Sequence, residues 1–496
     1  MNALVSLPII LPLLAAALSI ALGRWRWAQR LVGVVTLSAV NVISIVLLVR
    51  VDADGIVAVQ SGAWRAPIGI SLVADRFATI MLAVAALMLL AVLVYAIGQP
   101  GAENVHVGFH PVYLVLASGV SASFLSGDLF NLFVAFEVML TASYVLITLG
   151  GRADQVRTGM TYVVISLLAS MLFLISLAFV YAATGTVNMA HLSVRLTDVP
   201  SGVRSALAVL LIVVFGVKAA VFPLYFWLPD SYPTAPTPVT AVFAGLLTKV
   251  GVYALIRTQT LLFAPETRPG TLLLVIAGAT MVVGVLGAIA QDDIKRILSF
   301  HIVSQIGYMV MGLGLFTLVG LAGTVFYIVH HIVVKTTLFL SAGLVELRVG
   351  SGRLARIGGL AHVAPLLGVL FLVPALSLAG IPPFSGFVAK LALVEAGVGA
   401  GQYIVVGVSL VVSLLTLFSM MKIWTNAFWG EPEVDAERPV YDGPHAGPRL
   451  MVAATAVLAV VSIAVAAAAG PLFELSERAA VDLIDPSAYR RAVLGS

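Results

Sequence analysis

The stretch FGVKAAVFPLYFWLPDSY, residues 215–232, places Lys218 inside a long apolar run and Pro223 five residues after it. The run is apolar enough for a helix buried in lipid, but a proline removes a backbone donor and breaks the helical hydrogen-bond ladder. An ionised lysine at the centre of a bilayer costs about 3 kcal/mol on insertion scales. We therefore predict a broken membrane helix in which the lysine beside the break faces protein or water.

The composition indicates that most of the chain lies in lipid. Apolar residues make up 61% of the sequence and charged residues 10%, whereas soluble domains carry about 25% charged residues. Apolar windows of about 18 residues or more recur from Leu4 to Ala469, and each is long enough to cross ~30 Å of hydrocarbon. The predicted fold class is an all-α polytopic membrane protein with about fourteen transmembrane helices.

Several classes of function are excluded by what the sequence lacks. It has no cysteine, which excludes disulfides and thiolate metal sites, and its net charge of +4 gives no reason to expect a nucleic-acid partner. It carries no P-loop and no other cofactor motif. We expect no cofactor, no metal site and no enzymatic reaction in this chain. Any work that it does must then draw on an ion gradient or on a partner.

A second interrupted helix is predicted near the other end of the chain. The stretch LAGIPPFSGFVAK, residues 378–390, again sets a lysine, Lys390, beside helix-breaking residues. Paired broken helices are typical of transporters with internal repeats, in which the transport path lies at the repeat interface. The residues that we assign to the two breaks are Pro223, Gly380, Pro382, Pro383 and Gly386.

Ionisable side chains inside the predicted spans are the candidate functional residues. Five of these side chains lie near the centres of spans: Glu137, Lys218, Lys249, Lys335 and Lys390. If all five met lipid as ions, the cost of insertion would be roughly 15 kcal/mol, so they must face protein, water or one another. His331 stands four residues before Lys335, on the same helical face, and His330 adjoins it. The complete candidate set for proton transfer is Glu137, Lys218, Lys249, His331, Lys335, Lys390 and His330.

Lysine suits proton transfer in such a place. A desolvated lysine gives up its proton more readily, and a nearby carboxylate makes it keep that proton. A change in the separation of Glu137 and Lys218 would therefore switch the lysine between holding and releasing a proton. Arginine does not deprotonate, and we place no arginine deep in any span, which favours a relay. The alternative is structural, with lysines that reach an interface or pair to tie helices together.

The loops suggest an orientation. With the N-terminus outside, the inside loops hold slightly more Lys and Arg than the outside loops, so we expect both termini outside. The longest inside loop, within residues 427–448, is rich in Pro and Gly and carries charges of both signs, as a linker does.

Four long motifs resemble the antiporter-like subunits that are shared by Mrp-type multisubunit cation/proton antiporters and the membrane arm of respiratory complex I. The motifs occupy residues 223–257, 292–312, 329–339 and 377–393. Within this family, residues 128–150 and 183–193 look most like the D-type branch of the Mrp complexes.

The resemblance implies fourteen helices with two inverted five-helix repeats. The expected divisions are helices 1–3 in residues 1–110, the first repeat in 111–258, the second in 271–426, a cytoplasmic linker in 427–448, and helix 14 with a C-terminal tail in 449–496. The resemblance also assigns Glu137 and Lys218 to a pair on the fifth and seventh helices. Some relatives carry a further histidine where this chain has Tyr327, so the relay there runs through Tyr327, His330 or water.

We expect a proton-translocating subunit of a multisubunit Na+/H+ antiporter in a bacterial inner membrane. Its expected partners are the other membrane subunits of that complex, the lipid bilayer, and protons and Na+ as transported ions. Two alternatives stay open: a proton-pumping subunit of a redox complex, such as complex I or a membrane-bound hydrogenase, and a scaffold subunit that transports nothing. Glu137 is the only deep carboxylate, so a Na+ site in this chain alone is not expected.

Overall fold

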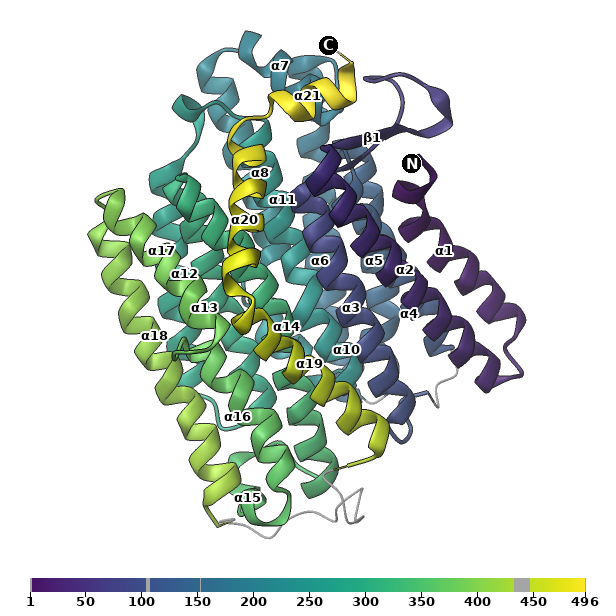
Figure 1. Cartoon of the computed structure of the whole chain (residues 1–496), viewed down its shortest axis with the longest axis vertical. Helices are drawn as coiled ribbons and strands as arrows, with labels where there is room; N and C mark the ends of the chain where they lie inside the picture. Colours follow the sequence, from purple (N-terminus) through teal and green to yellow (C-terminus); the bar gives the residue numbers. More distant parts are fainter. Residues whose placement is uncertain (1, 104–107, 152, 432–446, 496) are drawn as a thin grey trace.

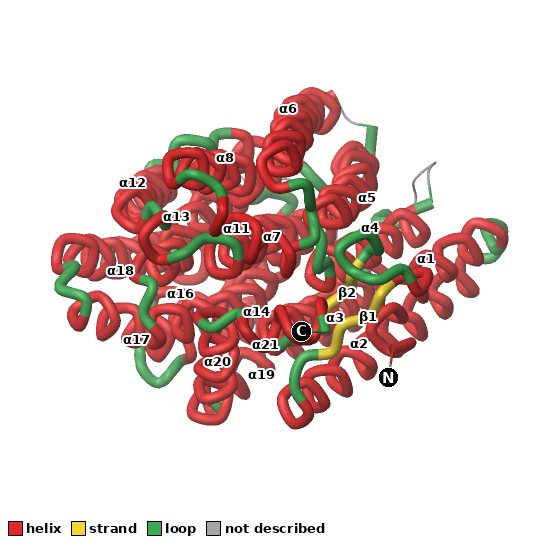
Figure 2. Tube along the Cα trace, turned by 90° about the horizontal axis from the view of Figure 1, so that it is seen from above, coloured by secondary structure: helices red, strands yellow, loops and turns green. Residues whose placement is uncertain are grey.

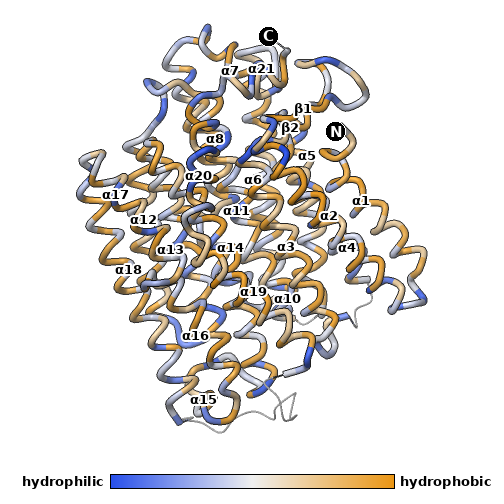
Figure 3. The backbone as a smooth tube through the Cα atoms, viewed as in Figure 1, coloured by the Kyte–Doolittle hydropathy of each residue, from blue (hydrophilic) through white to orange (hydrophobic). Residues whose placement is uncertain are grey.

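Long apolar helices dominate the computed structural model, which describes residues 2–103, 108–151, 153–431 and 447–495. In these ranges twelve helices are long and apolar enough to cross a membrane, and the shorter apolar helices Phe109–Leu125 and Pro365–Ala379 supply two further candidates. The helices lie side by side in one bundle (Figure 1), and apolar residues dominate its middle (Figure 3). The chain is a multi-pass membrane protein, and the predicted fold class is confirmed.

A small hairpin lies at one end of the first three long helices (Figure 1). They are α1 (Asn2–Ala21), α2 (Arg26–Asp54) and α3 (Arg76–Gly98), and strands β1 (Val57–Gln60) and β2 (Ser71–Ala74) lie between α2 and α3. The strands pair antiparallel, from Val57 opposite Ala74 to Gln60 opposite Ser71. Asp75 follows β2 directly, and its carboxylate caps α3 by accepting from the Ala78 amide at 2.8 Å.

The next segment contains the first break. Its helices are α4 (Phe109–Leu125), α5 (Leu129–Thr148), α6 (Ala153–Thr184), α7 (Met189–Arg195), α8 (Ser201–Ala219), α9 (Trp227–Ser231), α10 (Thr237–Val242), the π-helical turn η4 (Phe243–Leu247) and α11 (Thr248–Leu261). α4 and α5 are separate helices because Asp128 caps α5, accepting from the amides of Phe130 and Asn131. α8 ends at Ala219, one residue after Lys218, and the left-handed Ala220 follows it, so this break lies where Pro223 predicts it.

The second break lies in the following segment. This segment comprises α12 (Gly270–Ile289), α13 (Ile294–Leu315), α14 (Leu318–Val349), α15 (Leu360–Val363), α16 (Pro365–Ala379), α17 (Ser385–Gly399), α18 (Tyr403–Trp424) and a second π turn, η7 (Thr425–Trp429). α16 ends at the left-handed Gly380, and Pro382 and Pro383 separate it from α17. Gly386, which we assigned to the break, is instead the second residue of α17. A side chain there would collide with the carbonyl oxygen of Ser377.

The C-terminal segment is more regular than the expected tail. It contains α19 (Arg449–Ala467), α20 (Ala469–Ile484) and α21 (Ser487–Leu494), and both termini lie at the same end of the bundle, near the β-hairpin (Figures 1 and 2). The predicted linker lies largely outside the described residues, at 432–446. The described 3₁₀ turns are Ser61–Ala63, Leu196–Asp198, Tyr232–Thr234, Pro265–Thr267 and Leu354–Arg356.

Candidate functional site

Lys218 lies in the last turn of α8, where the helix dipole favours a cation. The side chain is buried, and its Nζ donates to the Ser166 carbonyl oxygen and to Ser170 Oγ, both at 3.1 Å. The break leaves carbonyls at the end of α8 without helical partners. The indole Nε1 of Trp227 supplies a further donor at this helix end, because it donates to the Val217 oxygen at 3.1 Å, and that oxygen also accepts from the Ala220 amide at 3.2 Å.

Glu137, on α5, joins Lys218 through a hydroxyl group rather than directly. Ser170 Oγ donates to Glu137 Oε1 and accepts from Lys218 Nζ. The described residues include no direct ion pair between the carboxylate and the ammonium. The two charged groups that the sequence pairs are therefore brought together, with Ser170 of α6 between them.

A small cavity extends from Lys218 toward the π turn. It has a volume of about 20 Å³, enough for about one water molecule, and its lining includes Lys218, Ser166, Tyr232 and Leu247. Leu247 is the last residue of η4, and Lys249 follows it by two positions. The cavity thus adjoins both the first lysine and the turn that carries the second.

Lys249 is fully buried at the junction of η4 and α11. Its Nζ donates to the Ala244 carbonyl oxygen at 2.5 Å and to Thr248 Oγ1 at 3.2 Å. A π-helical turn interrupts the regular helical ladder, and such turns are frequent at functional sites. Here the turn places the Ala244 carbonyl where the side chain of Lys249 binds it.

Two glycines allow neighbouring helices to approach Lys249 closely. A Cβ at Gly245 would lie 2.5 Å from Thr336 Oγ1 of α14, and a Cβ at Gly251 would lie 2.6 Å from the backbone nitrogen of Ala219 in α8. Contacts this short exclude a side chain at either position. Lys249 is consequently held between the helix that carries Lys218 and the helix that carries Lys335.

Three ionisable side chains at the centre of α14 are buried and carry unsatisfied nitrogen atoms. Lys335, His330 and His331 are fully buried. Lys335 Nζ, both ring nitrogens of His331 and Nε2 of His330 have no hydrogen-bond partner among the described residues. Each unsatisfied buried group costs about 1–3 kcal/mol, so this cluster is stable only where water or a transferred proton satisfies it.

Lys390 lies beside the second break in a well-satisfied position. Its Nζ donates at 3.0 Å to each of the Leu378 and Ala379 carbonyl oxygens, at the end of α16, and also at 3.0 Å to Ser413 Oγ of α18. Free carbonyls at a helix C-terminus favour a cation. Both breaks therefore place a buried lysine next to the end of the first half-helix.

His330 connects α14 to the second break. Its Nδ1 lies 2.9 Å from Ser385 Oγ, and that hydroxyl lies 3.3 Å from Ser377 Oγ. Tyr327 has a different role: its ring stacks on Tyr308, with centroids 5.4 Å apart, and its hydroxyl donates to Gln305. Of the routes left open by the sequence, His330 is the one with a side-chain hydrogen bond to α17.

Sequence reasoning missed the serines of this site and one buried arginine. Ser170, Ser385 and Ser413 each bond a candidate residue. The sequence placed no arginine deep in any span, but Arg257 is buried within α11. It is tolerated there because Asp75 binds it at two points, 2.6 Å from Nη1 and 2.7 Å from Nη2. The pattern of acids alone could not reveal this pair, since Asp75 and Arg257 are far apart in sequence.

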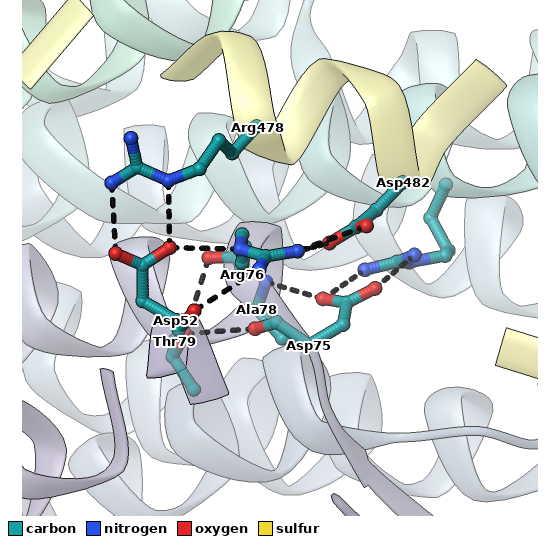
Figure 4. Close-up of polar contacts among 8 residues, drawn as sticks. Asp52, Asp75, Arg76, Ala78, Thr79, Arg478 and Asp482 are labelled. Carbon is teal, nitrogen blue, oxygen red and sulfur yellow. Dashed lines mark hydrogen bonds and ion pairs between the residues drawn. The ribbon is translucent and has the colours of Figure 1, made fainter. Parts of the chain in front are cut away.

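An ion-pair network at the end of the bundle that carries both termini surrounds Asp75. Arg76 binds Asp52 at 2.8 Å and Asp482 at 2.9 Å, and Arg478 binds Asp52 at 2.8 Å (Figure 4). Asp482 and Arg478 belong to α20, so the network ties the C-terminal segment to α2 and α3.

A large cavity opens at the end of the bundle opposite the termini. Its volume is about 600 Å³, and its lining includes Thr237, Asp293, Lys295 and Glu346. Lys295 binds Glu346 at 2.5 Å and donates to Thr237 Oγ1 at 3.1 Å. Charged groups are therefore paired at the wall of this opening, in contrast to the unsatisfied groups on α14.

Comparisons with known proteins agree with one another. A family model described as NADH:quinone oxidoreductase/Mrp antiporter, TM, matches residues 126–416. The chain is 46% identical to the D-type subunit of the Na(+)/H(+) antiporter of Alkalihalophilus pseudofirmus over 498 residues, covering all of both chains. It matches a chain of the Mrp complex from Dietzia sp. DQ12-45-1b at a TM-score of 0.93 and 36% identity, again over all of both chains. A chain of the membrane-bound sulfane sulfur reductase, an archaeal respiratory membrane complex, gives a TM-score of 0.90 and 26% identity over the same coverage.

Proposed function

The chain belongs to the NADH:quinone oxidoreductase/Mrp antiporter family of membrane subunits, and on that premise we propose that it is the D-type subunit of a multisubunit Na+/H+ antiporter. Its partners are the other membrane subunits of that complex. The full-length identity to a named D-type subunit is 46%, and the likeness to a chain of an Mrp complex covers the whole molecule. The chain acts as a secondary transporter subunit and not as an enzyme.

Within the complex this subunit carries protons along the buried polar residues. The observation that supports this role best is the unsatisfied cluster of Lys335 and His331, in the core of the bundle. A purely structural charge would be paired, as Arg257 is with Asp75. Groups that must take up and release protons instead need water or a neighbour that changes during the cycle.

The proposed proton path follows the positions of the candidate groups through the bundle. Protons pass among the following groups: Glu137, Lys218, Lys249, His331, Lys335, His330 and Lys390. Ordered water links the groups that do not touch, and Lys218 responds to the charge of Glu137. Na+ prefers several oxygen ligands, and Glu137 is the one candidate carboxylate of the relay, so we assign the Na+ path to other subunits.

Two other functions are distinguishable from this one. The likeness to a chain of an archaeal respiratory complex favours a redox-driven pump as the second candidate, although the identity there is 26% against 46% for the D-type relative. Genes for small membrane subunits beside this gene would support the antiporter, and genes for flavin or iron–sulfur subunits would support the redox pump. A scaffold role would leave transport intact when the relay residues are changed.

Orientation and internal symmetry form part of the proposal. The excess of Lys and Arg in one set of loops supports both termini outside a bacterial plasma membrane. Alkaline phosphatase fused to the C-terminus should then be active, because it folds only outside, and a fluorescent protein that requires the cytoplasm should be dark. The opposite result would reverse the orientation. The two breaks support inverted repeats in residues 111–258 and 271–426.

Glu137→Gln is the test of the proposed function. It removes the ionisable group and keeps nearly the same shape, so antiport in everted vesicles should fall to about a tenth or less while partner subunits still co-purify. Glu395→Gln is the matched control, because Glu395 is an exposed carboxylate on α17 outside the proposed path. Full antiport in the Glu137 variant would refute the relay role. Loss of co-purifying subunits would instead support a scaffold.

A further inference from the structure

Ser170 occupies a position that the proposed roles of Glu137 and Lys218 do not explain. It lies on α6, one turn after Ser166, and both residues face Lys218. The ammonium of Lys218 donates to the Ser170 hydroxyl at 3.1 Å, and the hydroxyl in turn donates to Glu137 Oε1. Ser170 itself is buried, which shields the three-residue chain from competing water at the serine.

The hydroxyl of Ser170 donates to a different kind of acceptor from the hydroxyls of Ser176 and Ser123, two other helical serines of this protein. Serine in a helix commonly donates to the carbonyl one turn earlier. Ser176, on the same helix, does so with Leu172 at 2.7 Å, and Ser123 does so with Gly119 at 2.8 Å. Ser170 gives its single hydrogen to Glu137 instead. Its lone pairs are thereby left for the ammonium of Lys218.

We propose that Ser170 is a proton-conducting bridge between Lys218 and Glu137. This inference rests on the proposed relay and adds a member to it. In the transfer, an Nζ–H bond of Lys218 breaks and that proton binds Ser170 Oγ, while the original hydroxyl proton leaves Oγ and binds Glu137 Oε1. The products are a neutral amine, an unchanged serine and a protonated carboxyl group. The total charge is conserved, and the reverse transfer retraces the same bonds.

A bridge changes what the Glu137–Lys218 pair needs in order to exchange a proton. Without it, one side chain must swing until carboxylate and ammonium touch. With it, both groups stay in place, and a rotation of one hydroxyl resets the chain of hydrogen bonds. The small cavity is lined by Lys218, Ser166 and Leu247 of η4, and its lining does not include Ser170 or Glu137. The bridge therefore serves proton transfer between Glu137 and Lys218, and water serves the transfer between Lys218 and Lys249.

The test compares Ser170→Thr with Ser170→Val in the complete complex. These side chains are nearly equal in size, but only threonine keeps the hydroxyl, so their ratio isolates the bridge from packing and excludes a water in the serine's place. We expect the threonine variant to retain antiport and the valine variant to fall roughly tenfold or more below it per assembled complex. The valine variant should also show an altered profile of rate against pH, because the lysine and carboxyl no longer exchange a proton directly.

The same pair of substitutions at Ser176 is the matched control, since Ser176 is buried on the same helix and bonds only its own backbone. There the two variants should transport equally. If Glu137→Gln alone proves inactive but the threonine and valine variants at Ser170 transport at equal rates, the bridge would be overturned and the relay would stand. An active Glu137→Gln would overturn the relay itself. A pH profile unchanged in Ser170→Val would also count against the bridge.

Discussion

Lys249 offers a direct test at the scale of a single residue, because it lies between the helix that carries Lys218 and the helix that carries Lys335. A structural cation there should survive replacement by arginine, which keeps the charge and the ability to donate to the Ala244 carbonyl. A proton carrier should not, because the guanidinium keeps its proton at any usable pH. We expect Lys249→Arg to lose antiport nearly as fully as Lys249→Ala, by about tenfold or more, in assays across about pH 7 to 9 normalised to assembled complex. Near-normal transport by the arginine variant would mean that Lys249 never deprotonates.

The residues that sequence alone identified are those with a high cost of placement in lipid. A lysine or glutamate in an apolar run is conspicuous, and Lys218, Lys249 and Lys335 all prove buried. Serines leave no such signal, because they are common in membrane helices and usually bond their own backbone. Ser170 could be identified as a candidate only from the structure, in which it lies between Glu137 and Lys218.

Elements were predictable where the chemistry of one residue decides them. Proline and glycine marked both breaks, whereas the separation of α4 from α5 became certain only from the structure, in which Asp128 caps α5. The π turn η4 has no comparable signature, because it depends on how α8 and α14 pack against Gly251 and Gly245. A local sequence pattern cannot predict tertiary contacts of this kind.

One inter-element contact outside the spans predicts a response to acid. Glu103, after α3, accepts from Arg30 Nε of α2 at 3.0 Å and lies 2.7 Å from His110 Nε2 of α4. Burial opposes its ionisation, but hydrogen bonds from His110 and Arg30 outweigh burial and lower the pKa of Glu103 to about 2. Such a carboxyl stabilises the fold fully above its unfolded pKa of ~4.3, and this stabilisation is lost as the pH falls through the folded pKa.

Glu103→Gln should therefore lower the melting temperature in detergent at pH 7, by an amount that corresponds to about 1–3 kcal/mol. The difference from the natural protein should shrink as the pH is lowered from about 5 toward about 2, because the natural protein loses the contribution that the variant already lacks. Thermal unfolding measured at a series of pH values, with Glu395→Gln as control, checks both points. A constant difference across that range would show that Glu103 acts through packing alone.

At the scale of the whole molecule, hydropathy was enough to predict the bundle but not its C-terminal end. Residues 469–496 carry charges of both signs and suggested a tail, yet α20 packs along the bundle and its Arg478 and Asp482 are paired with residues of α2 and α3. The partners of Arg478 and Asp482 lie far away in the sequence, and no window of local hydropathy can detect them.

The whole chain on its own should transport little. Its described residues include no group of three or more His, Asp or Glu side chains that could hold a metal ion, and its relay needs a cation path that we assign to other subunits. Liposomes that contain only this chain should show little or no Na+-dependent proton movement, whereas liposomes with the complete complex should show it. Robust exchange by the isolated chain would require a cation path within it.

The π turn η4 also has a consequence for protein engineering. A common route to heat resistance replaces helical glycines by alanine, at a gain of about 0.5–1 kcal/mol each. Gly278 of α12 suits that route, because a Cβ there meets no heavy atom within 4 Å. Gly245 does not, since its Cβ would lie 2.5 Å from Thr336 Oγ1 of α14, so that Thr336 or its helix would have to shift. A mutant library selected for survival of heating in detergent should accept alanine at Gly278 and reject it at Gly245. The π turn η4, between α10 and α11, is thus a segment in which selection for stability should retain the glycine.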